Sequence, residues 1–233
     1  MNEPKNKILN NLKELLNSYL TESFAKDFMK VLDEDISLIS GNNKNFTDLE
    51  KEQIEYEMPE GFTYRISVDK IITLCSKLLS EEKYFSLMLD LSQLMLFAGE
   101  VSYSLEIAES LLGKLNASER NTDIKAEANL MISKIYWSQA YWDDCHYFIN
   151  EAMKIFGSIE SEDGIAKCEN MLGTLYGEKG EFDEAKTHLE KALKHLKGDD
   201  SNSIRAMIQT NLGVINTIKG NFEKAVWNYK NAS

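Results

Sequence analysis

One feature constrains the fold of this 233-residue chain more than any other: a pattern of small and large residues that returns every forty residues. Two copies match with an offset of forty at every position, and they consist of Leu172, Gly173, Tyr176, Gly180, Phe182, Ala185, Leu189 and Ala192, then Leu212, Gly213, Asn216, Gly220, Phe222, Ala225, Tyr229 and Ala232. A more divergent copy lies forty residues earlier, at Ile132, Ser133, Tyr136, Ala140, Trp142, Cys145, Ile149 and Ala152. A faint copy precedes it by forty-one, at Leu91, Ser92, Met95, Gly99, Val101, Ser104, Ala108 and Leu111. A fixed period of this length predicts units that stack on their neighbours.

The composition indicates that each unit is helical. Only 2 prolines and 12 glycines interrupt the chain, whereas a sheet-rich fold needs many turns. Gly173 and Gly213 provide small residues where two antiparallel helices can approach closely, because a large side chain there would overpack. Gly180 and Gly220 follow at positions suited to ending the first helix of a pair. We therefore predict an all-α protein built from stacked helix-turn-helix hairpins.

The pattern resembles the tetratricopeptide repeat (TPR) family, whose signature spaces a Leu-Gly pair, a Tyr, a Gly, an aromatic residue and two alanines across a helix-turn-helix. The unit from Ala166 to Lys197 matches nearly every position, but has Glu169 in place of the opening Trp and Lys197 in place of the late Pro. The resemblance covers about residues 81–233. The period of forty resembles the longer-helix subclass found in kinesin light chains and bacterial peptide-sensing regulators. The resemblance implies a TPR-like α-solenoid over residues 67–233, with units at about 81–115, 122–157, 163–198 and 203–233.

Residues 1–66 contain no copy of the repeat, although apolar residues recur there at helical spacing. Thr47 and Glu50 fit a capping box that would open a third helix, and residues 66–79 form a further apolar helix. We expect an N-terminal helical subdomain over residues 1–66 that caps the solenoid. A DNA-reading helix-turn-helix is disfavoured there by the local excess of acidic residues.

Charge and hydropathy exclude several classes of partner. The net charge of −12 repels nucleic acid and anionic lipid in the absence of a basic patch, and no apolar run approaches the ~20 residues of a membrane span. The polar start of the chain lacks a secretory signal, and its three cysteines form no CxxC pair. We expect a cytoplasmic protein that binds neither nucleic acid nor membrane.

No catalytic constellation, cofactor motif or metal-ligand spacing stands out in the sequence. We expect His188 and His195 to be surface residues, since no Asp or Cys at metal spacing joins them. Cys145 occupies the small-residue position of the repeat, which indicates packing rather than reactivity. The sequence therefore predicts no enzyme activity, no cofactor and no metal site.

In the resembled family, the first helix of each hairpin lines a concave groove. Carried over by position, the partner-binding residues that the resemblance implies are Gln93, Lys134, Trp137, Lys167, Asn170, Thr174, Met207, Thr210 and Asn211. Asn211 stands where the longer-helix subclass often uses Asn to hydrogen-bond a peptide backbone. Trp137 could equally serve in packing between hairpins. Lys134 and Lys167 lie beside Glu127, so a basic clamp for a C-terminal carboxylate is not supported.

These observations favour a non-catalytic scaffold that binds a protein or peptide in the groove. A peptide-responsive signalling receptor of the bacterial regulator type, or the interaction fragment of a larger regulatory protein, is the alternative. Ser233 falls within the second helix of the last unit, which leaves that helix uncapped. We expect either a fragment of a longer protein or a homodimer formed through this helix.

Overall fold

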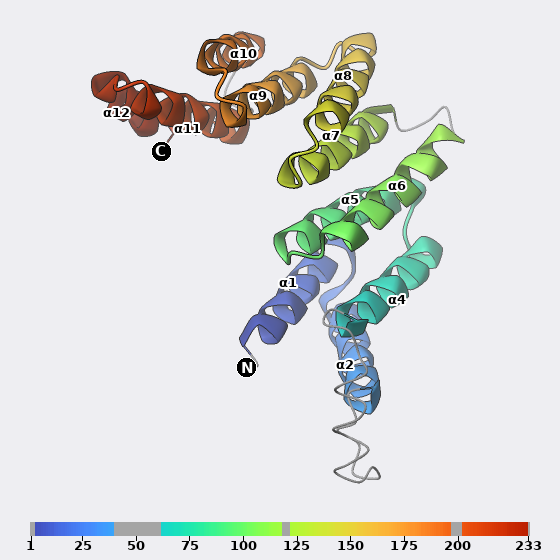
Figure 1. Ribbon diagram of the computed structural model, residues 1–233. Helices are drawn as coiled ribbons and strands as arrows, with labels where there is room; N and C mark the ends of the chain where they lie inside the picture. The colour runs from blue at the N-terminus through green and yellow to red at the C-terminus, as the bar shows by residue number, and fades with distance from the viewer. Residues whose placement is uncertain (1–2, 40–61, 118–121, 197–201, 233) are drawn as a thin grey trace. The chain divides into compact units, whose positions relative to one another are not determined.

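A computed structural model describes residues 3–39, 62–117, 122–196 and 202–232, which form helices with no strand among them (Figure 1). The helices are α1 (Glu3–Tyr19), α2 (Glu22–Ile39), α4 (Phe62–Leu78), α5 (Glu81–Phe97), α6 (Val101–Asn116), α7 (Thr122–Ser138), α8 (Trp142–Ser158), α9 (Glu162–Glu178), α10 (Phe182–His195), α11 (Asn202–Ile218) and α12 (Phe222–Asn231). The all-α class predicted from the sequence is confirmed. The chain groups into two compact units, Met1–Ile107 and Ala108–Ser233, with the boundary inside α6.

In the first unit, α1 packs on α2 and α5, and α4 packs on both α2 and α5. Fully buried apolar side chains from three of these helices form its core: Leu12, Leu16, Ile71, Leu87, Met88, Leu91 and Met95. The helix predicted over residues 66–79 corresponds to α4, whereas the capping box at Thr47 and Glu50 lies outside the described residues. The separate cap over residues 1–66 stays a prediction.

The faint repeat copy forms a helix-turn-helix, α5–α6, although its small residues are serines. Ser92 donates its hydroxyl to the Ser104 carbonyl at 2.8 Å, and Ser104 returns a bond to the Ser92 carbonyl at 2.7 Å. Both side chains are fully buried, so the reciprocal bonds satisfy hydroxyls that would otherwise be unpaired. Two short side chains thus let α5 and α6 cross closely, as glycine and alanine do further along the chain.

The second unit contains the three clearer copies as the hairpins α7–α8, α9–α10 and α11–α12, which follow one another in Figure 1. A Cβ atom on Gly173 would lie 2.6 Å from Leu189 Cγ and 3.2 Å from the Ala185 carbonyl oxygen, so only glycine permits the crossing of α9 and α10. The equivalent Gly213 faces the Tyr229 ring, which a Cβ would approach to 2.5 Å. The predicted role of these glycines is confirmed.

A left-handed residue ends the first helix of each hairpin. Gly180 has φ +79° and Gly220 has φ +74°, the conformation that glycine adopts without steric cost. Ala140 occupies the same position in α7–α8 and has φ +59°, which an L side chain rarely adopts. The turn geometry is therefore kept even where the sequence departs from glycine.

Successive hairpins pack mainly through the second helix of one and the first helix of the next, α8 on α9 and α10 on α11, and their first helices also touch. α7 contacts α9 and α9 contacts α11, whereas the second helices α8, α10 and α12 make no comparable contact with one another in the described part of this unit. First helices are therefore closer together than second helices, which places α7, α9 and α11 on the inner, concave side of the unit.

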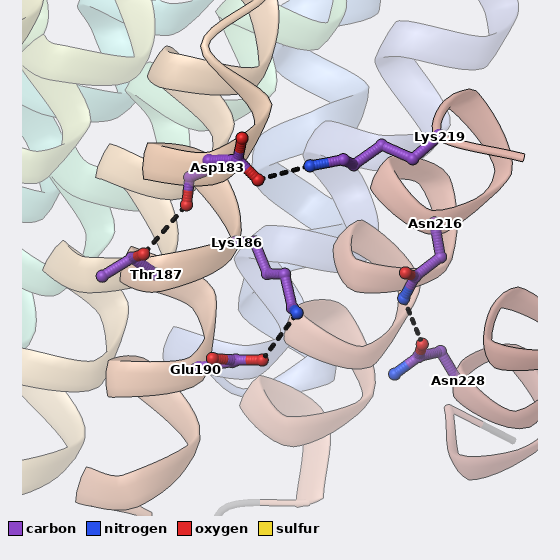
Figure 2. Close-up of polar contacts among 7 residues, drawn as sticks. All are labelled: Asp183, Lys186, Thr187, Glu190, Asn216, Lys219 and Asn228. Carbon is purple, nitrogen blue, oxygen red and sulfur yellow. Dashed lines mark hydrogen bonds and ion pairs between the residues drawn. The ribbon is translucent and has the colours of Figure 1, made fainter. Parts of the chain in front are cut away.

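Polar contacts add to this packing at the last two hairpins. Figure 2 shows an ion pair between Lys219 and Asp183, which joins the turn after α11 to α10. It also shows Asn216 donating to Asn228 Oδ1 at 2.9 Å, which joins α11 to α12.

Candidate functional site

The concave side of the second unit brings together most of the predicted groove residues. They lie on its three first helices, with Lys134 and Trp137 on α7, Lys167, Asn170 and Thr174 on α9, and Met207, Thr210 and Asn211 on α11. The remaining predicted residue, Gln93, is half-buried on α5 in the first unit. Met207 and Thr210 are exposed, so α11 presents accessible side chains of both polar and apolar character.

A hydrogen-bonded cluster links α9 to α11 at the centre of this surface. Asn211 Nδ2 donates to Asn170 Oδ1 at 2.9 Å and to Thr174 Oγ1 at 3.3 Å. Asn170 is buried, while Thr174 and Asn211 are half-buried. The amide nitrogen of Asn211 is therefore used within the protein, but Asn211 Oδ1 has no hydrogen-bond partner among the described residues and can accept one from a ligand.

The basic residues of this surface differ in their partners. Lys167 Nζ forms an ion pair with Glu127 Oε1, which joins α9 to α7. Lys134 has no ion-pair partner among the described residues, and its side chain is exposed. Nearby protein nevertheless desolvates the ammonium group, which lowers the pKa of Lys134 despite the attraction of Glu127. The Lys134 ammonium group can therefore pair with an anionic group of a ligand.

Trp137 packs against the buried residues between the hairpins α7–α8 and α9–α10, a set that includes Ile149, Leu172 and Leu175. Its side chain is half-buried, and its indole Nε1 is buried without a hydrogen-bond partner among the described residues. The alternative of packing between hairpins is therefore what the structure shows for this residue.

A pocket of about 230 Å³ opens between α9, α10 and α11. Residues from all three helices line it: Gly173, Thr174, Gly177, Glu178, Phe182, Leu189, Asn211, Val214, Ile215 and Ile218. Thr174 and Asn211 belong to the predicted groove set, but sequence reasoning did not identify the second-helix residues Phe182 and Leu189 as lining residues. The signal that could have found the pocket is Gly177, which stands where the preceding hairpin has Trp137.

The titratable residues considered for chemistry are buried or paired. Burial raises the pKa of Cys145 and of Cys168 to about 12, so both thiols stay protonated at neutral pH. His188 is not the surface residue expected, because its side chain is only 20% exposed and its Nδ1 lies 2.6 Å from Glu169 Oε2. His195 makes the same contact with Glu162, at 2.6 Å. Within the described ranges, His, Cys, Asp and Glu form no group of three that could hold a metal ion.

The outer face of α12 exposes large apolar side chains. Phe222 is 66% exposed and Trp227 is 60% exposed. The sequence places Phe222 where Phe182 packs on the following hairpin, and no described hairpin follows α12. Self-association through this helix stays a prediction.

Comparisons with known proteins support the fold. A profile of the family described as the Suppressor of spindle checkpoint defect 1 C-terminal domain matches residues 148–233, less than half of the chain. No curated protein matches the chain significantly. No described helix is both long enough and apolar enough to cross a bilayer.

Solved structures of three repeat proteins are similar to this chain. The apo form of RapI has a TM-score of 0.57 at 16% identity, over 73% of this chain and 60% of RapI. A Rap protein complexed with competence and sporulation factor has a TM-score of 0.57 at 18% identity, over 89% of this chain and 64% of that protein. The TPR-like repeats of a putative kinesin light chain from Podosopora anserina have a TM-score of 0.50 at 14% identity, over 72% of this chain and 82% of that chain. This chain therefore spans less than two thirds of either Rap protein, and its fold is an all-α, TPR-like solenoid.

Proposed function

We propose that this chain is a non-catalytic scaffold that binds a protein or peptide along the concave side of α7, α9 and α11. The observation that carries the proposal is the pocket between α9, α10 and α11, together with Asn211 Oδ1 at its edge, which has no hydrogen-bond partner in the described part of the chain. Pockets that combine apolar walls with a few polar groups are the usual sites of ligand recognition. Lys134 extends this surface to α7 and offers a charge for an acidic group of the ligand.

The net charge of −12 supports a protein or peptide over nucleic acid as the partner. A peptide laid along α7, α9 and α11 would meet the desolvated Lys134, the amide cluster and the exposed Met207 in turn. This sequence of charged, polar and apolar contacts favours recognition of side chains as well as of backbone. The predicted residues Lys134, Lys167, Asn170, Thr174, Met207, Thr210 and Asn211 remain part of this proposal, with Trp137 contributing through packing and Gln93 as a candidate on α5.

Selection from a phage-displayed library of random peptides tests this proposal. Thr210→Arg places a bulky charge on the concave side of α11, where the native side chain bonds only to the Ala206 carbonyl of its own helix at 2.9 Å. Thr187→Arg is a matched control, since Thr187 is also exposed and bonds to the Asp183 carbonyl at 2.9 Å on the second helix α10.

We expect peptides enriched on the native chain to lose binding to Thr210→Arg and to keep it with Thr187→Arg. Thermal melts of both variants check that each remains folded. The proposal is wrong if no peptide is enriched, or if the enriched peptides bind Thr210→Arg as well as the native chain.

A peptide-responsive signalling receptor is the second candidate, favoured by the similarity to a Rap protein in complex with competence and sporulation factor. In that case an enriched peptide should change the hydrodynamic radius of the chain, because ligand binding would alter the pitch of the solenoid. A scaffold should bind the same peptide with an unchanged radius. Dynamic light scattering with and without saturating peptide separates these outcomes.

A further inference from the structure

The sixteenth residue of the first helix differs sharply between the three hairpins of the second unit. This position holds Trp137 on α7, Gly177 on α9 and Thr217 on α11, at offsets of forty. Trp137 packs on the buried cluster between its own hairpin and the next, and Thr217 bonds to the Gly213 carbonyl at 2.8 Å. Gly177 contributes no side chain to the space between α9–α10 and α11–α12, whereas Trp137 fills part of the corresponding space one repeat earlier.

The pocket at Gly177 is the equivalent of the space around Trp137. Three of its walls, Phe182, Leu189 and Ile215, stand forty residues after Trp142, Ile149 and Leu175. Those earlier residues belong to, or pack on, the same cluster as Trp137. The space between α9–α10 and α11–α12 thus has the walls that surround the Trp137 indole one repeat earlier, but no indole ring.

Sterics do not require glycine at this position. A Cβ on Gly177 would lie 3.4 Å from Ile215 Cδ1 and 4.0 Å from Ala185 Cβ, which are ordinary van der Waals contacts. Gly173, one turn earlier, is different, because a Cβ there would lie 2.6 Å from Leu189 Cγ. The helix crossing therefore explains Gly173 but leaves the absence of a side chain at Gly177 to another cause.

The polar groups of the two hairpins are complementary. On α7, the Trp137 indole N–H is buried with no acceptor among the described residues. On the next first helix, α9, Met171 holds the position that Asn211 holds one repeat later on α11. One repeat later, Asn211 on α11 borders the Gly177 pocket, and its Oδ1 has no donor among the described residues. Among the described residues, the site at Trp137 therefore has an indole N–H donor without an acceptor, and the site at Gly177 has the Asn211 Oδ1 acceptor without a donor.

We propose that the Gly177 pocket receives a tryptophan side chain from a bound peptide, with the indole N–H donating to Asn211 Oδ1. This deepens the proposed function, on which it rests, by naming the side chain that anchors the peptide. The pocket volume of about 230 Å³ lies below the roughly 300–1,000 Å³ of sites that enclose a whole drug-sized ligand, and so suits a single large side chain. Aromatic anchors in such pockets carry a large share of binding energy in many interfaces.

NMR titration of the ¹⁵N-labelled chain tests this with three capped pentapeptides, Ac-Ala-Ala-Xaa-Ala-Ala-NH₂, in which Xaa is Trp, Phe or Ala. We expect the Trp peptide to shift the amide signals of Gly173, Gly177 and Asn211. The Phe peptide should bind roughly threefold to tenfold more weakly, because it lacks the one donor, and the Ala peptide should cause no shift there.

Two variants make the test specific. Gly177→Trp copies the second hairpin and fills the pocket, so it should abolish binding of the Trp peptide, while Gly157→Trp on the open surface of α8 is its matched control. Asn211→Leu should erase the preference for Trp over Phe and keep the apolar contact. This second variant decides the matter if Gly177→Trp does not fold.

The outcomes separate this inference from the proposed function. If library-selected peptides bind in a Thr210-sensitive way but the Trp peptide binds no better than the Ala peptide, the indole site is wrong and the scaffold stands. If Asn211→Leu keeps the Trp-over-Phe preference, the assigned hydrogen bond is wrong. If no library peptide binds the native chain, the proposed function itself fails.

Discussion

The hairpins α7–α8 and α9–α10 share one backbone plan but fill the space between their helices differently. In the first, the Tyr136 and Phe148 rings stack with centroids 5.6 Å apart and an interplanar angle of 15°. In the second, the Tyr176 ring stacks on His188 at 5.1 Å and 5°. The comparison shows that ring shape is retained at this position while its polarity changes.

The polar ring of His188 is accompanied by a change in the buried residue that it contacts on the first helix. His188 Nδ1 contacts the carboxylate of Glu169, which is buried on α9, whereas the equivalent Asn129 on α7 bonds to the Lys125 carbonyl of its own helix at 2.8 Å. In the last hairpin the same positions hold Gln209 and Asn228, whose side chains bond at 2.6 Å. In these last two hairpins a polar residue on the first helix is therefore matched by a polar residue on the second, whereas Asn129, which has Phe148 at the matching position, bonds within its own helix, and in each case the buried group has a hydrogen-bond partner.

Removing the small residue that all these hairpins share should have the largest effect. Gly173→Leu would drive a side chain into Leu189 and the Ala185 backbone, and we expect a loss of about 3 kcal/mol in the free energy of unfolding, at the upper end for overpacked cores. Urea denaturation of the full chain measures this. Gly157→Ala on α8 is the control, because no atom lies within 4 Å of its added Cβ, and it should be neutral or slightly stabilising. A midpoint equal to that of the control would contradict the close helix crossing.

Converting the hairpin α9–α10 to the chemistry of α7–α8 should have an intermediate effect. His188→Phe keeps a stacking ring but leaves the Glu169 carboxylate, 11% exposed, without its partner. We expect the free energy of unfolding to fall by about 2 kcal/mol, which is the cost of leaving a buried polar group without a hydrogen-bond partner. Thermal and urea unfolding of the variant measure it.

The double variant Glu169→Asn with His188→Phe reproduces the Asn129 and Phe148 pair and should recover most of that loss. A double-mutant cycle with Glu169→Asn alone isolates the coupling between the two side chains. Strict additivity of the two single changes would show that the contact does not stabilise the hairpin.

The smallest effect should come from the turn. Ala140 adopts a left-handed conformation that costs an L residue about 1–2 kcal/mol, and glycine removes this cost while loosening the unfolded chain. We expect Ala140→Gly to stabilise the chain by about 0.5–1 kcal/mol and the reverse change Gly180→Ala to destabilise it by a similar amount. Differential melting temperatures compare the two, and a stabilising Gly180→Ala would count against the shared turn geometry.

Much of the fold was predictable from the sequence because the repeat expresses local requirements. Gly173, Gly180 and their copies forty residues later meet steric limits that few other residues satisfy, so their spacing predicted the helices, turns and close crossings. The same spacing placed Thr174 and Asn211 on inner helices. It could not show that Lys167 is paired with Glu127 while Lys134 has no ion-pair partner among the described residues, since ion pairs between repeats depend on side-chain directions.

The sequence by itself determined the all-helical repeat and the identity of its small positions, because contacts within one hairpin depend on residues at fixed separations. Only the tertiary structure decided the pocket at Gly177, the Asn211 oxygen that no described residue bonds, and the buried indole N–H of Trp137. Each of these arises where three helices meet, and the residues that fill or leave that space come from two different hairpins. The chemistry available to a partner is therefore set by the packing of one repeat on the next.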